Sequence, residues 1–200
     1  NFGYQPTQWG SAQTVPPLNV GSRHHEYSEV AEQAGRCGIA LAYLRTATNS
    51  TEGLDKEDGM IRLMARVAAQ YHGIFAQPVP SPAASRPWSI KDKLKHFTEV
   101  GFAVPLALEA WILRYERTRE PQLRQNIEKV VAILRRIAVH DPSGYAYFPS
   151  RVVPFDEQGN VAWSGPSDPT GAYHYGAAAS VGPLAHWAQL TRDDDLMEYV

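Results

Sequence analysis

Cysteine is nearly absent from this chain of 200 residues, which contains only Cys37. A single thiol forms neither an internal disulfide nor a zinc site built from several thiolates. Long apolar runs are absent as well. No segment approaches the roughly 20 consecutive apolar residues that a helix needs to cross a bilayer, so we expect no membrane span.

Excess charge of either sign is also missing. The net charge is −2, from 19 Lys and Arg against 21 Asp and Glu, and the seven histidines are scattered. Without a basic field there is nothing to attract nucleic acid, and we expect no nucleic-acid partner. The P-loop, GxGxxG and G-x-S-x-G patterns are absent, and His24-His25 has no convincing third ligand nearby. We therefore expect neither a cofactor nor a metal. The oligomeric state stays open.

The ends of the chain favour a piece of a longer protein. The first residue is Asn1 rather than Met, which indicates processing or cutting upstream. The last residues, 195–200, have the pattern of a helix that is just beginning. Residues 1–200 have the size and hydrophobic content of one domain, or of part of one.

The segment 91–140 predicts two antiparallel helices around which the rest is organised. In the second, apolar residues from Leu123 to Ala138 recur with helical spacing, and Pro121 suits a first turn. The first, 91–120, is apolar on more than one side, so we expect it to be buried and covered by the second. Similar patterns predict helices at 25–48, 59–72 and 175–190. Gly35 and Gly38 favour close contact between helices.

A degenerate repeat supports an all-α fold built from helical hairpins. The segment Thr118–Leu123 recurs as Thr191–Leu196, and Tyr27–Val30 recurs as Phe97–Val100. The shift that aligns the second pair also places Thr48 on Thr118. We therefore predict pairs of an inner and an outer helix at about 25–72, 91–140 and 175–200.

The connections between these helices are of two kinds. Those inside a hairpin are short and polar, whereas 74–89 and 141–175 are long and rich in proline and aromatic residues. An up-and-down array brings all long connections to one end, where binding sites usually lie. Within the second, 145–155 and 161–163 predict a small β-hairpin around Gly159.

These features together resemble the (α/α) toroids of carbohydrate-active enzymes, namely the six-hairpin glycoside hydrolases and the related polysaccharide lyases. The segment Leu184–Leu196 is similar to their hairpin turns, although Arg192 stands where a glycine is usual. Three hairpins would form about half of such a barrel. The resemblance implies a carbohydrate substrate and a periplasmic or secreted bacterial protein.

The resemblance also implies catalytic carboxylates at the end with the long loops. Asp168 is the preferred general acid or base, with Glu26 or Glu99 as its partner. A lyase acting on a uronate polymer would instead use Tyr173 and His174. Simpler explanations stay open: Asp168 before a proline suits a turn, Glu26 suits a helix N-terminus, and Glu99 could be paired in the packing.

Further residues are candidates for substrate binding. Aromatic rings stack on sugar faces, although on loops they often only hold the loop to the scaffold. Imidazoles and guanidinium groups bind hydroxyls and uronates. The candidates are Trp88, Trp163, Tyr147, His25, His96 and Arg151. A non-catalytic helical-repeat module that binds a glycan or protein is the alternative from another class. Two carboxylates converging in one pocket would favour the hydrolase.

Overall fold

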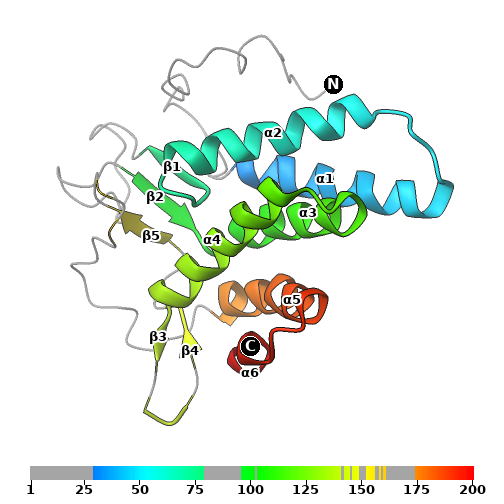
Figure 1. Ribbon diagram of the computed structural model, residues 1–200. Coiled ribbons are helices and arrows are strands. Elements are labelled where there is room, and N and C mark those ends of the chain that lie inside the picture. Colours follow the sequence, from blue (N-terminus) through cyan, green and yellow to red (C-terminus); the bar gives the residue numbers. More distant parts are fainter. Residues whose placement is uncertain are drawn as a thin grey trace.

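The computed structural model describes residues 29–78, 96–101, 103–140, 142–144, 146–148, 152–155, 158, 160 and 174–200. These parts are mostly helical, with short strands (Figure 1). In chain order the elements are α1 (Glu29–Thr48), α2 (Leu54–Gln70), β1 (Ala76–Pro78), β2 (His96–Glu99), α3 (Ala103–Thr118), α4 (Pro121–Ile137), β3 (Val139–His140), β4 (Ala146–Tyr147), β5 (Val152–Phe155), α5 (His174–Thr191) and α6 (Asp194–Tyr199).

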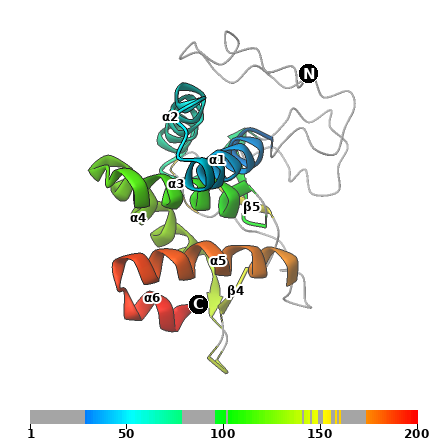
Figure 2. The ribbon, with the colours of Figure 1, turned by 90° about the vertical axis from the view of Figure 1, so that its right-hand side faces the viewer.

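The six helices of the described residues form three hairpins, as the repeat predicts. The inner helices α1, α3 and α5 contact one another in succession, and each is followed across a short turn by an outer helix, α2, α4 or α6. In Figure 1 the inner helices begin on the side of the strands and the outer helices run back toward it. Figure 2 shows that α5 and α6 form a layer of their own, with α5 steeply inclined to α1.

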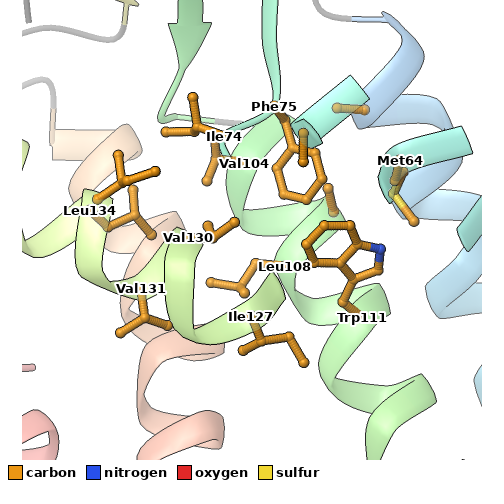
Figure 3. Close-up of a cluster of buried hydrophobic side chains, with 14 of the residues drawn as sticks. Met64, Ile74, Phe75, Val104, Leu108, Trp111, Ile127, Val130, Val131 and Leu134 are labelled. Atoms are coloured by element: carbon orange, nitrogen blue, oxygen red, sulfur yellow. The ribbon is translucent and has the colours of Figure 1, made fainter. Parts of the chain in front are cut away.

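The core lies where α3 is covered by α4 and by the chain that follows α2 (Figure 3). The predicted stripe on α4 is buried, from Leu123 to Ile137, and α3 is buried on most sides. The rings of Trp111 on α3 and Phe75 meet edge to face at 4.6 Å. Both predictions for this pair of helices are confirmed, although α4 ends at Ile137 because β3 follows almost at once.

Two glycines let α1 approach α3 at backbone distance. A Cβ atom added to Gly35 would lie 2.6 Å from the carbonyl carbon of Leu106 and 2.7 Å from the backbone nitrogen of Ala107. One added to Gly38 would lie 2.9 Å from the Cβ of Ala110. Real Cβ atoms essentially never come so close, so only glycine permits this contact. The prediction of close helix contact at Gly35 and Gly38 is confirmed.

The repeat is also visible in the geometry of the short turns. Each inner helix ends on a threonine whose hydroxyl donates to the carbonyl four residues earlier, at 2.7 Å for Thr48, 3.0 Å for Thr118 and 2.7 Å for Thr191. The next residue has a positive φ each time, at Asn49 (52°), Arg119 (56°) and Arg192 (57°). Glycine suits this conformation best, which explains its frequency in similar turns.

Two predicted helix starts are wrong. The helix expected at 91–120 begins at Ala103, and residues 96–99 form strand β2. A short run with Phe97 and Thr98 fits a strand as well as a helix, so its pattern could not decide. The helix expected from Gly59 begins at Leu54, because Gly53 caps it with φ 71° and acidic residues fill its first turn.

The strands at the place of the predicted β-hairpin have pairings that the sequence did not predict, and the hairpin itself stays a prediction. Strand β5 pairs antiparallel with β2, which also pairs with β1, so β2 is the central strand of a three-stranded sheet. Strand β4 pairs with β3. Residues 161–163, the expected partner of β5, lie outside the described residues. Sequence order favoured a local partner, whereas β5 pairs with a strand more than 50 residues earlier.

Candidate functional site

The structure places four of the eleven candidate residues. His25, Glu26, Trp88, Arg151, Trp163, Asp168 and Tyr173 lie outside the residues that it describes. Of the other four, His96 and Glu99 lie on β2, Tyr147 lies on β4, and His174 is the first residue of α5.

Strand β2 leads almost directly into the inner helix α3. Its first residue, His96, pairs with Phe155 of β5, and its last, Glu99, pairs with Val152. The helix expected at 91–120 would have placed His96 and Glu99 one turn apart on one face. In strand β2, which advances about 3.3 Å per residue, they are about 10 Å apart. His174 opens the next inner helix on the side of the sheet (Figure 1).

Tyr147 lines a small hollow between β4, α5 and α6. The hollow measures about 60 Å³, and its other lining residues include Val181, Tyr199 and Val200. Pockets that enclose small-molecule ligands usually measure about 300–1,000 Å³. This hollow is therefore of the size that accepts the tip of a side chain, and too small to enclose a sugar ring.

A buried carboxylate, Glu57, lies beside the short turns, at the end of the hairpin array opposite to the strands. It is 1% exposed and forms ion pairs with Arg45 of α1 and Arg117 of α3. Its Oε1 also lies 3.5 Å from Nη1 of Arg114, which reaches Asp58 at 2.8 Å through Nη2. We call Glu57 and these three arginines the Glu57 cluster.

The surroundings of Glu57 keep its carboxylate ionised. Burial alone would raise the pKa of Glu57, but hydrogen bonds from Arg45 and Arg117 outweigh it and hold the pKa below its ordinary value. A carboxylate enclosed by three guanidinium groups does not offer a proton to a substrate. The Glu57 cluster ties α1, α2 and α3 together. The sequence did not predict this cluster, because the helix expected from Gly59 left Glu57 in a polar turn.

A second charged group spans the contact between α3 and α5. Nδ1 of His186 lies 3.0 Å from Oε1 of Glu109, and its Nε2 lies 3.7 Å from Oε2 of Glu116. The hydrogen bond to Glu109 raises the pKa of His186; burial opposes the rise, and the charges of both glutamates add to it. The ring is partly buried. We call these three residues the His186 clasp.

The His186 clasp joins the second and third hairpins, because a positive imidazole on α5 faces two carboxylates on α3. When it is protonated, the imidazole donates a hydrogen bond from Nδ1 to Glu109, and Nε2 faces the carboxylate of Glu116 at ion-pair distance. The edge-to-face contact of Tyr115 with Trp187, at 5.3 Å, lies in the same interface. The signal was present in the sequence, since Glu109 and Glu116 are seven residues apart on an apolar helix, but their partner on α5 was not predictable from spacing.

The described residues offer no metal centre. Among them no three His, Cys, Asp or Glu side chains are arranged to hold a metal ion, the His186 clasp included. Within the same parts of the chain no helix is long and apolar enough to cross a membrane.

Searches of protein-family models, curated proteins and solved structures found no match to this chain.

Proposed function

We propose that this chain forms part of an (α/α) toroid and acts as a glycoside hydrolase, with its site at the end of the array where the inner helices begin. One observation carries the proposal. The sheet and the first turns of α3 and α5 lie on one side of the hairpin array, so His96, Glu99 and His174 are brought to the same end by elements distant in sequence.

The chemistry proposed for this end needs two carboxyl groups. One protonates the glycosidic oxygen while the other activates water or attacks the sugar, and their separation decides between inversion and retention. Asp168, in the connection that leads into α5, is proposed as the general acid. Glu99, beside the start of α3, is proposed as its partner, with Glu26 as the alternative. His174 and Tyr147 are proposed to contact the sugar.

The charged groups elsewhere support this choice of end. The Glu57 cluster lies at the short turns and is closed by its own arginines. In the His186 clasp the imidazole is engaged by two glutamates of its own chain. Both groups have a structural role that accounts for their residues, so neither is proposed as the catalytic pair.

The test is a screen of the full chain on nitrophenyl glycosides and uronate polymers, with Asp168→Asn and Glu99→Gln as variants. We expect release of nitrophenol that falls about 10²–10⁴-fold in each variant, the usual contribution of acid or base catalysis. Glu52→Gln is the matched control, because Glu52 is an exposed carboxylate in a short turn at the opposite end. Its activity should equal that of the unaltered chain.

Other outcomes would refute the hydrolase. Formation of an unsaturated uronate, lost in Tyr173→Phe and His174→Gln, would show a lyase. Silence on every substrate, together with retained binding of a glycan, would show a non-catalytic module. An equal loss in Glu52→Gln and Asp168→Asn would mean that the activity does not arise at the proposed end.

A further inference from the structure

The two contacts within the inner layer of helices are built differently. Between α1 and α3 the backbones meet at Gly35 and Gly38, and the Glu57 cluster ties both helices to α2. Between α3 and α5 the contact is made by side chains. In Figure 2 the third hairpin, α5 with α6, lies as a layer against the first two. The first two hairpins therefore form one unit, to which the third is attached.

Three interactions attach α5 to the second hairpin and the residues just before it. The hydroxyl of Ser180 donates to the carbonyl of Val100 at 3.2 Å, and Tyr115 meets Trp187 edge to face. The third interaction is the His186 clasp. Histidine is the side chain that changes its charge near neutral pH, so the clasp is the part of this contact that pH can alter.

The charged groups that face His186 are both on α3. They are Glu109, at 3.0 Å from Nδ1, and Glu116, at 3.7 Å from Nε2. Helix α5 itself contains no Asp, Glu, Lys or Arg. Helix α6 also packs on α5, but in the described part of the chain its acidic residues form no ion pair with His186. The hydrogen bond to Glu109 and the charges of the two glutamates are what raise the pKa of His186.

Loss of the proton from His186 removes the charge that binds the two glutamates. A neutral imidazole that still donates from Nδ1 to Glu109 turns the lone pair of Nε2 toward the carboxylate of Glu116. The docked form also holds the proton more tightly than a free histidine does. Its stabilisation is therefore complete below the ordinary pKa of 6.5 and is lost as pH rises through the raised pKa.

We propose that the His186 clasp is a pH-sensitive joint, from which α5 and α6 undock together when His186 loses its proton, while α1 to α4 stay folded. Helix α6 follows α5 because the N–H of Asp193 donates to the carbonyl of Ala188, and its carboxylate accepts from the N–H of Leu196, both at 2.9 Å. Such undocking is a local opening of the native fold. It does not depend on the proposed enzymatic function.

Hydrogen exchange of the full chain, followed by mass spectrometry from about pH 5.5 to 8.5 and corrected for the intrinsic rates, tests the joint. The opening constant of the amides at 184–199 should rise with pH. The rise should be about tenfold for each unit by which the pKa of His186, measured by NMR on the imidazole, exceeds 6.5. At each pH the amides of α1 and α3 should exchange through a rarer opening.

Variants identify the group that is responsible. His186→Gln should abolish the rise, because glutamine carries no charge at any pH. Glu116→Gln should reduce it and leave the fold intact, because this side chain is half exposed. His140→Gln is the matched control. His140 is exposed and meets the third hairpin at Tyr199, with ring centroids 5.8 Å apart, so this variant should keep the full rise.

The proposal fails on any of three results. Amides of α5 that share one opening constant with those of α1 and α3 at every pH would mean that the third hairpin does not undock by itself. An opening constant at 184–199 that stays level or falls as pH rises would contradict the role of the proton. A rise that persists in His186→Gln, or disappears in His140→Gln, would assign the effect to another group.

Discussion

Replacing Gly35 with alanine should destabilise this fold, although alanine is the better helix former. In an unhindered helix interior the change would stabilise by about 1 kcal/mol. Here the added Cβ would meet three backbone atoms of α3, from Leu106 and Ala107, at 2.6–2.8 Å. Backbone atoms cannot rotate away as a side chain can, so α1 and α3 must separate by several tenths of an ångström.

The size of the effect follows from two opposing terms. Overpacking of a tight contact costs about 1–3 kcal/mol. Separation of the helices also loosens the Gly38–Ala110 contact one turn further along. The gain in helix propensity offsets part of these two costs, and we expect the free energy of unfolding to fall by about 1–2 kcal/mol. For a chain of this length that is a fall in Tm of about 2–8 °C.

Gly59→Ala provides the matched control. Gly59 lies inside α2, and an added Cβ there would meet no atom within 4 Å. This variant should gain about 0.5–1 kcal/mol. Urea unfolding of both variants, followed by circular dichroism, measures the difference. If Gly35→Ala is stabilised as much as Gly59→Ala, the close approach of α1 to α3 is wrong.

Three further predictions concern the charged groups and the turns. Glu57→Gln should lower the free energy of unfolding, measured in urea, by about 1.5–3 kcal/mol, because the partly buried guanidinium groups around Glu57 lose the charge that they bind. His186→Gln should destabilise mainly at acidic and neutral pH. Since the pKa of His186 is raised, its stabilisation is complete below the ordinary value of 6.5 and is lost as pH rises through the raised pKa. Arg119→Gly should raise Tm, because relief of the left-handed backbone, about 1–2 kcal/mol, exceeds the entropy of about 0.4–1 kcal/mol that glycine adds to the unfolded chain.

Each of these has a result that contradicts it. For Glu57, a loss no larger than that of Glu52→Gln would mean that the carboxylate is not buried among arginines. For His186, the difference in unfolding free energy between the unaltered chain and His186→Gln should shrink as pH rises. A difference that grows with pH would show that the protonated imidazole does not stabilise the fold. For Arg119, a lower Tm in the glycine variant would show that the guanidinium over the Tyr115 ring, at 5.4 Å, matters more than the backbone strain.

The hairpins were predictable because their signals are local. The stripe on α4 has helical spacing over 17 residues, and the threonine turns repeat in sequence. Strand β2 was not predictable, since four residues do not distinguish the helical period of 3.6 residues from the strand period of 2. Its partner β5 also lies far along the chain. The same limit explains the Glu57 cluster and the His186 clasp. Each depends on which helices pack together, and that is decided by the whole core rather than by spacing.

The three threonine turns have a consequence for how such a chain can grow or shrink. Because Thr48, Thr118 and Thr191 end their helices in the same geometry, each stretch from one turn to the next begins and ends in the same local backbone conformation. Excising 119–191 would join Thr118 to Arg192 and recreate a turn of the same backbone shape. Gene duplication or loss at these joints would therefore add or remove a helix pair while keeping the local conformation of the turn.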